Sequence, residues 1–416
     1  MSAQEAAVKE SQSTAAPSSR PAHFFVASDW ACLLIAITSA VAGGAMVLKF
    51  FPGPKSAFVL LLLSAAVAGA MLWLRWIQLR RITLGRKWLV MAWCLFALLF
   101  AVLFPLSHQH RFGVGSDRDD ALRVASAALV HGHYPYYGRT YFGNPITPLP
   151  GAVILATPFY LLGNVGLENL FWLAIFLWFS SIYFRERSTA LMLVLLTLGA
   201  VSANLDDFVV GGDYGINGIY VAIALFAMIA TADRDRPLIL HIAACVLLGL
   251  AIDSRPTYIV VFPLVAAYLW QHSGPKVALR AVLISGLVAG VSSIPFYLYD
   301  PAHFGPLHVT HKLDMIPAKF RPTVVLPVAG LLIASVGFLT KLSVPRVYLL
   351  LGLSMLVMSG VPGILGWLFA GPTTVDGWYW LGWLSLPAFF ILLWSLRVYE
   401  DNSEALRAAN HPAAVP

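Results

Sequence analysis

The sequence predicts an all-α, polytopic membrane protein, and three observations support this fold class. Hydrophobic residues make up 59% of the 416 residues, while charged residues make up only 11%. Soluble globular chains carry about 25% charged residues, so a chain with so few would not cover a surface that faces water. Apolar runs that match a bilayer core of about 30 Å recur along the chain, without the short alternating segments of a β-barrel.

Twelve apolar segments are predicted to cross the membrane as helices. They cover residues 31–51, 57–78, 88–107, 168–184, 189–203, 214–231, 238–252, 257–271, 277–298, 322–340, 347–368 and 378–396. A further apolar piece at 148–164 contains three prolines and is too short to span comfortably. We expect it to form an interfacial or re-entrant helix. If it crossed, the chain would have thirteen spans and part of the topology would be inverted.

The net charge of +7 is explained by membrane topology, so no nucleic-acid partner is expected. Five basic residues crowd one short loop: Arg75, Arg80, Arg81, Arg86 and Lys87. Cytoplasmic loops carry an excess of Lys and Arg, so this loop is predicted to lie in the cytoplasm. The polar segment 1–30, rich in Ala, Ser and Pro, is predicted to be a disordered cytoplasmic tail, and 397–416 a second cytoplasmic tail.

Two large loops, 109–147 and 300–321, are predicted to face away from the cytoplasm. Counting helices from the N-terminal tail gives this result, and so does counting back from the basic loop at 341–346, provided that 148–164 does not cross. The turn at 204–213 contains three acids and no Lys or Arg, and it falls on the same non-cytoplasmic side.

The first of these loops contains the densest group of carboxylates in the chain. Asp117, Asp119 and Asp120 open an apolar helical run within 113–162. If the helix begins near Ser116, then Asp117 and Asp120 share a face and Asp119 points away. Capping by Ser116 or Asp117 would explain one acid. Three ionisable groups beside a membrane are costly, and they therefore indicate a functional site.

Histidine and aromatic side chains are also concentrated in the two outer loops. Seven of the eleven histidines lie in or beside them: His108, His110, His131, His133, His303, His308 and His311. The spacing HxH occurs twice, but no HExxH or carboxylate-rich zinc pattern accompanies it, so no metal site is predicted.

The order of three motifs resembles the GT-C glycosyltransferases, most closely the polyprenol-phosphate-dependent mannosyltransferases of glycosyltransferase family 87. The first motif is Ser116-Asp117 followed by Gly132 and Pro135-Tyr136. The second is GGDYGINGIYVAIALF at 211–226, and the third is GLAIDSRPTYIVVFPLV at 249–265. The likeness spans roughly 88–321. In three places the chain departs from the family pattern: the second acid of a DD pair is displaced, a Gln is replaced near Gly212-Asp213, and Arg255 stands where Lys is commoner.

This resemblance implies a GT-C-like bundle with a catalytic module at 88–321. Two additional helices at 31–87 would precede the module, and helices at 322–396 would follow it. The implied activity is transfer of a sugar, a mannose-like hexose, from a polyprenyl-phosphate carrier to a hydroxyl of a lipid-linked or cell-envelope glycan. The active site would lie on the non-cytoplasmic face of the plasma membrane, among its lipids, and no cofactor would be needed.

The resemblance also implies roles for individual residues. Asp117 is the first choice for the general base on the acceptor hydroxyl, Asp120 is the second and Asp119 the third. Arg255 would hold the phosphate of the donor, although an arginine that only anchors a helix end is an equal alternative. The other expected substrate contacts are His131, Tyr136, His308 and His311.

Two other functions remain open from the sequence. A transporter or lipid-carrier flippase would also be polytopic with buried charges, but such proteins often contain inverted repeats, and the 113–162 pattern has no second copy. A structural subunit without catalysis would leave the acid cluster unexplained.

Overall fold

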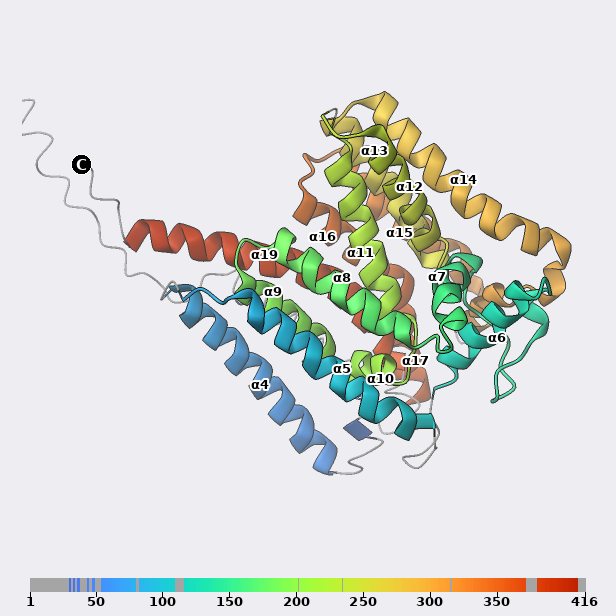
Figure 1. Ribbon diagram of the computed structural model, residues 1–416, viewed down its shortest axis with the longest axis horizontal. Coiled ribbons are helices and arrows are strands. Elements are labelled where there is room, and N and C mark those ends of the chain that lie inside the picture. The colour runs from blue at the N-terminus through green and yellow to red at the C-terminus, as the bar shows by residue number, and fades with distance from the viewer. Residues whose placement is uncertain are drawn as a thin grey trace, which may run out of the picture.

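The computed structural model describes residues 54–410 except 80–81, 109–115, 201, 234, 315 and 372–379, together with a few positions between 30 and 48. The predicted tail at 1–30 and the predicted span at 31–51 therefore lie largely outside the described residues. The described elements are all helical, and the single extended pairing among them is an isolated bridge between Arg139 and Pro145 (Figure 1).

Within the described residues, seven helical segments are long and apolar enough to cross a membrane. They are α4 (Pro54–Leu79), α5 (Arg86–His108), α11 (Tyr214–Thr231), α14 (Pro275–Tyr299), α15 (Pro322–Ser335) with its flanking turns, α16 (Val344–Met355) continued by η8 (Leu356–Gly360) and α17 (Val361–Ala370), and α19 (Ser385–Asn410). The chain is thus an all-α, multi-pass membrane protein.

Four other predicted spans are present as shorter helices. They are α8 (Leu167–Tyr183), α9 (Arg187–Val194) continued by the π-turn η2 (Leu195–Ala200), α12 (Leu238–Ile252), and α13 (Val261–His272) preceded by η3 (Pro256–Val260). Each lies where the apolar pattern places it, but none reaches the roughly 20 residues that a full crossing needs. Twelve crossings therefore remain a prediction.

The outer surface of α14 shows which solvent the bundle is built for. Leu279, Leu283, Leu287, Val291 and Ile294 recur about once per helical turn, and each is more than half exposed. A continuous apolar strip of this length would be an aggregation site in water. In a bilayer it faces the hydrocarbon, which explains how the chain manages with so few charges.

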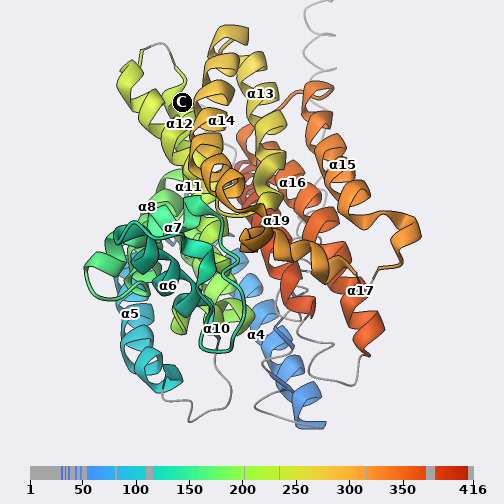
Figure 2. The same ribbon diagram turned by 90° about the vertical axis from the view of Figure 1, so that its right-hand side faces the viewer.

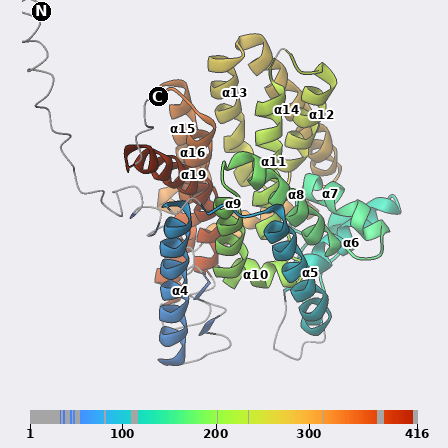
Figure 3. The same ribbon diagram turned by 60° about the vertical axis from the view of Figure 1, so that its left-hand side comes forward.

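The helices are arranged around α11, which is the most deeply buried of the long ones. It packs against α8, α12 and α19, while α16 packs against α19 and α14 covers α12 and α13. The short helices α6 (Arg118–Val130) and α7 (Pro150–Leu161) contact each other at one side of the bundle (Figures 1, 2 and 3).

The two predicted outer loops meet in the fold. The Tyr137 hydroxyl donates a hydrogen bond to the Asp300 carboxylate over 3.0 Å. The backbone of Gly305 lies so close to the Ile146 carbonyl that a side chain at this position would overlap it. Both loops therefore belong to the same end of the molecule, in agreement with the helix count.

Helix α19 continues to Asn410, so the predicted end of this span at 396 is wrong and most of the predicted tail at 397–416 is helical. The helix continues because polar residues beyond 396 have partners in the bundle. The buried Glu400 carboxylate accepts hydrogen bonds from the backbone N–H of Arg185 at 3.0 Å and of Glu186 at 2.6 Å. Arg397 pairs with the same carboxylate at 2.9 Å.

Helix α7 is 12 residues long, too short to cross, as the prolines at 148–164 predict. It is fixed at its N-terminus by an unusually close backbone approach. The Gly151 N–H donates to both the carbonyl and the carboxylate of Asp253, at 3.0 and 2.9 Å. Leu149 N–H donates to the Ser254 carbonyl over 3.3 Å. Only glycine allows α7 and the end of α12 to come this close.

Replacing Gly151 with alanine is expected to destabilise the protein. The new Cβ would lie 2.6 Å from the Asp253 carbonyl oxygen, which is inside van der Waals contact. Overpacking typically costs about 1–3 kcal/mol, so the Tm of the purified protein in detergent should fall by several degrees. The control is Gly69→Ala in α4, where a Cβ meets nothing within 4 Å. Equal Tm values for the two variants would contradict the close-packing interpretation.

Candidate functional site

Asp117 lies just before α6, and its carboxylate is held by the turn that follows. Its Oδ2 accepts a 2.5 Å hydrogen bond from the Thr140 hydroxyl and a 2.8 Å bond from the Asn144 side-chain amide. The residue occupies the N-cap position, but its side chain makes no capping bond to the helix. The other oxygen, Oδ1, has no hydrogen-bond partner among the described residues. Asp117 is thus oriented from one side and open on the other.

Asp117 and Asp120 share a face of α6, as their spacing predicts, and Asp119 points elsewhere. Asp120 is buried, and both of its oxygens are bonded: Oδ1 to Arg123 at 2.6 Å and Oδ2 to the backbone N–H of Tyr141 at 2.8 Å. Asp120 therefore fixes the 140–144 turn against the helix that carries Asp117.

Asp119 is buried against the C-terminal end of α5. Its Oδ2 lies 2.7 Å from Nε2 of His108, while Oδ1 is buried without a partner. The other ring nitrogen of His108, Nδ1, lies 2.8 Å from the carbonyl of Phe104, which only accepts, so Nδ1 carries a proton. The contact between Nε2 and the Asp119 carboxylate is a hydrogen bond only if a second proton is present, either on the His108 ring or on the Asp119 carboxylate. Burial raises the pKa of Asp119, and the hydrogen bond from His108 opposes that shift.

Arg118 connects the start of α6 to the last turn of α10 (Ser202–Val209), just before α11. Its guanidinium pairs with Oδ1 of the buried Asp207 at 2.6 Å. The second oxygen of Asp207 accepts from the backbone N–H of Gly215 at 2.8 Å. The two residues are far apart in sequence, so no local pattern reveals this pair. The signal in the sequence is the acid-rich segment 204–213, which also indicates the topology.

Arg255 makes a second ion pair at the turn between α10 and α11. Its guanidinium lies 2.8 Å from Oδ1 of the buried Asp213, whose other oxygen accepts from the Asn217 amide at 3.1 Å. The Nε of Arg255 is buried and has no hydrogen-bond partner. About a quarter of the side chain remains exposed. Arg255 is therefore a cation held in place by Asp213, and its buried Nε–H bonds no described residue.

Tyr214 brings the two arginines together. The guanidinium carbon of Arg118 lies 5.0 Å from the centre of the Tyr214 ring, and that of Arg255 lies 5.1 Å from it. Both distances are in the range of a cation–π contact. Because each arginine also holds one buried aspartate, the two cations are fixed around one ring at the end of the bundle that carries Asp117.

Two further polar side chains lie beneath this group and were not predicted. Glu168 is buried at the start of α8. Asn169 donates through its amide to the carbonyls of Phe208 at 3.0 Å and Gly212 at 3.2 Å. Asn169 therefore sets the backbone path of the turn. The feature of the sequence that indicates Glu168 is the presence of an acid at the edge of an apolar span.

Asp253 fixes the loop that carries Arg255. Its carboxylate accepts hydrogen bonds from the hydroxyls of Ser292 at 2.6 Å and Ser293 at 2.5 Å, in addition to the Gly151 N–H. Helices α7, α12 and α14 are thereby joined at one point. Burial raises the pKa of Asp253 to about 6, against the lowering effect of these hydrogen bonds.

Two expected substrate contacts lie in other surroundings. His131 is at the C-terminal end of α6, opposite to Asp117, and its Nδ1 lies 2.7 Å from the Ala127 carbonyl. Tyr136 is buried, and its hydroxyl donates to the Pro148 carbonyl over 3.1 Å. Their described bonds are to backbone carbonyls, so they contribute to the loop structure and the structure does not bring them to the acids.

His308 and His311 lie in η5 (Gly305–Leu313), the segment whose first residue contacts Ile146. The His308 side chain is exposed. That of His311 is outside the described side chains. Both remain candidate contacts at the end of the molecule that carries Asp117.

The side chains of the candidate site combine an acid with two cations. The same end of the bundle carries a carboxylate with one oxygen that no described residue bonds and two guanidinium groups held in place, which are groups that can accept a proton and stabilise an anion. Within the described residues, no group of three His, Cys, Asp or Glu side chains is arranged to hold a metal ion. Comparison with known proteins finds no matching family model, curated protein or solved structure.

The raised pKa of Asp253 predicts a specific pH dependence. The folded protein keeps the proton up to about pH 6, while the unfolded chain loses it near the ordinary value of 3.8. The contribution of Asp253 to stability is therefore present at low pH and decreases as the pH rises from 4 to 6.

Asp253→Asn should remove this dependence. The free energy of unfolding of the variant minus that of wild type should increase by up to about 3 kcal/mol as the pH is raised from 4 to 7. The unfolding of both proteins in detergent would be followed at several pH values by tryptophan fluorescence. Hydrogen bonds lost in the variant lower its stability by the same amount at every pH, so they do not alter the change of this difference with pH. Parallel curves would show that Asp253 titrates normally.

Proposed function

We propose that this protein is a membrane-embedded glycosyltransferase. It would move a sugar, a mannose-like hexose, from a polyprenyl-phosphate carrier to a hydroxyl of a lipid-linked or cell-envelope glycan, on the non-cytoplasmic face of the plasma membrane. One observation carries the proposal: Asp117, with an open oxygen, directly precedes Arg118, which with Arg255 surrounds Tyr214. The proposal rests on this base and these two cations belonging to the same end of the bundle.

The proposed reaction uses both parts of that arrangement. Asp117 accepts the proton of the acceptor hydroxyl as its oxygen bonds to the anomeric carbon of the donor sugar. The bond from that carbon to the phosphate oxygen breaks, and the polyprenyl phosphate leaves with the negative charge. Arg118 and Arg255 stabilise the developing charge through charge-assisted hydrogen bonds. The base finally holds the proton, and the phosphate oxygen holds the electron pair.

The contacts favour Asp117 over the other two acids as the base. Both oxygens of Asp120 are bonded, one to Arg123 and the other to Tyr141. In Asp119 one oxygen is bonded to His108, and the other is buried. A general base must reach the proton that it removes. Asp117 is oriented by two neutral donors, the Thr140 hydroxyl and the Asn144 amide. Asp120 and Asp119 then serve to position the helix and the turn.

The location of the basic residues supports the proposed sidedness. The Arg187 guanidinium donates to the Leu84 carbonyl at 3.3 Å, so two basic loops predicted to be cytoplasmic meet. These loops lie at the other end of α5 from His108 and the acids. A polyprenyl-phosphate donor has its phosphate at headgroup depth, which suits a site at the end of the bundle.

A transporter is the second candidate, because Glu168 is a buried acid in an apolar helix that is paired with no described cation. Such residues often lie on ion or substrate pathways. Sugar transfer by the purified protein from a polyprenyl-phosphate sugar would distinguish the two functions.

Asp117→Asn is the central test. The amide keeps an oxygen for the Thr140 and Asn144 bonds but cannot accept the proton of the acceptor, so transfer should fall by about 10²–10⁴-fold. Detergent Tm and yield should be unchanged. Asp235→Asn, in the loop after α11, is the control and should transfer at the wild-type rate. If Asp117→Asn is fully active while Asp119→Asn is inactive, the base has been assigned to the wrong carboxylate.

The phosphate role of the arginines is best tested with paired variants. Arg255→Gln alone leaves Asp213 buried without its cation, which typically costs about 3–5 kcal/mol and would confuse folding with function. The double variant Arg255→Gln with Asp213→Asn keeps a hydrogen bond and removes both charges. Its Tm should be near that of wild type, while transfer should fall by about 10²-fold or more.

The matched pair at the other arginine is Arg118→Gln with Asp207→Asn, and the same result is expected. Arg255→Lys should retain part of the activity, because lysine keeps the positive charge but lacks the planar array of N–H donors that a guanidinium offers to a phosphate. Wild-type transfer by both double variants would show that the two ion pairs serve only to hold the fold together.

A further inference from the structure

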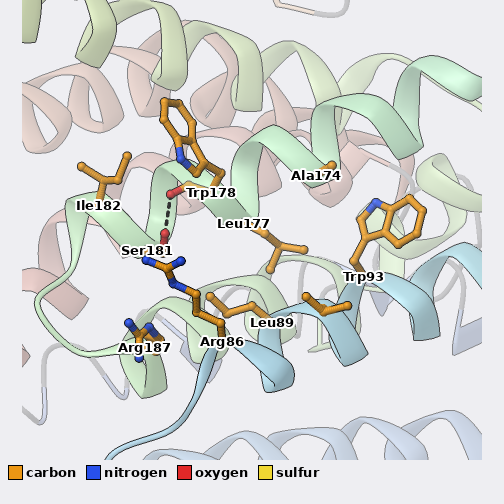
Figure 4. Close-up of a pocket in the computed structure, with 10 residues that line it drawn as sticks. Arg86, Leu89, Trp93, Ala174, Leu177, Trp178, Ser181, Ile182 and Arg187 are labelled. Atoms are coloured by element: carbon orange, nitrogen blue, oxygen red, sulfur yellow. Dashed lines mark hydrogen bonds between the residues drawn. The ribbon is translucent and has the colours of Figure 1, made fainter.

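A groove runs between α5 and α8 on the outer surface of the bundle, away from the candidate site (Figure 4). It has a volume of about 480 Å³. Leu89, Val90 and Trp93 of α5 form one wall, and Leu177 and Trp178 of α8 form the other. The size is that of one long acyl chain, and both walls are apolar.

Two arginines lie at one end of the groove. Arg86 and Arg187 are placed there, while Trp93 lies at the other end (Figure 4). Arg187 makes one described bond, to the Leu84 carbonyl, and Arg86 makes no hydrogen bond or ion pair with any described residue. No Asp or Glu lines the groove. The end is therefore cationic and has no carboxylate of its own to neutralise it.

We propose that this groove binds one anionic phospholipid of the surrounding bilayer. An acyl chain would lie along the apolar walls, and the phosphate would accept hydrogen bonds from Arg86 and Arg187. Guanidinium groups suit phosphate because their N–H donors match two of its oxygens. Basic pockets between transmembrane helices are known to attract anionic headgroups, and each nearby cation adds to the attraction.

The charge at the groove distinguishes this occupant from two others. Arginines that only snorkel to the interface would attract anionic headgroups without the groove, so filling the groove would leave lipid retention unchanged. A helix of a partner protein would need acids opposite Arg86 and Arg187 and would not favour a free lipid. The groove lies at the opposite end of α5 from His108, so this inference does not depend on the proposed sugar transfer.

Native mass spectrometry of the purified protein provides the test. The protein would be incubated with dioleoylphosphatidylglycerol or with dioleoylphosphatidylcholine, which has the same chains and no net charge. Wild type should retain the glycerol lipid preferentially. Arg86→Gln with Arg187→Gln should reduce its retention at least about tenfold, and should reduce retention of the choline lipid, whose phosphate charge is balanced by its own ammonium group, by much less. Arg346→Gln, an exposed arginine on another basic loop, is the control and should behave as wild type.

A second pair of variants tests the acyl-chain half of the groove. Ala174→Trp would fill the groove while both arginines remain, and it should also reduce retention of the glycerol lipid. Ala101→Trp on the exposed surface of α5, outside the groove, should not. Equal retention of the two lipids by wild type would overturn the proposal. So would undiminished retention in the double arginine variant, or an equal loss in Arg346→Gln. If the double variant does not fold, Arg86→Gln alone provides the same comparison.

Discussion

The end of the molecule that carries Asp117 depends on buried aspartates that each hold an arginine. Asp207 fixes Arg118 and Asp213 fixes Arg255, and the two pairs join α6, the start of α11 and the loop after α12. A buried ion pair seldom adds much net stability, because removing charges from water is costly. What such pairs provide here is position: the cations stay in place around Tyr214 because their partners are anchored by backbone and amide donors.

The three acids at 117–120 show how one short segment supports several roles. They are adjacent in sequence, yet α6 directs each to a different neighbour: the 140–144 turn, His108, or Arg123. The helix thereby separates an open carboxylate from two structural ones. Composition alone would count them as one cluster, and only their contacts assign them different functions.

The sequence predicts the helices well because the length and position of an apolar run are local properties. The spans at 214–231 and 238–252 agree with α11 and α12 in both bounds. The face shared by Asp117 and Asp120 also follows from local geometry. Ion pairs are different, because Arg118 and Asp207 meet only once α10 is packed against the start of α6. The extension of α19 was missed for the same reason, since Glu400 is stabilised by residues more than 200 positions away.

The shortness of α8 and α12 has a consequence for the surrounding membrane. At 1.5 Å per residue, their 17 and 15 residues extend only about 25 and 22 Å, less than a hydrocarbon core of about 30 Å. A bilayer answers such hydrophobic mismatch by thinning next to the protein. Headgroups would then lie deeper along these helices than elsewhere, and so would any phosphate carried on a lipid. The depth at which the protein meets the headgroups of its lipids is thus set by helix length as well as by charge.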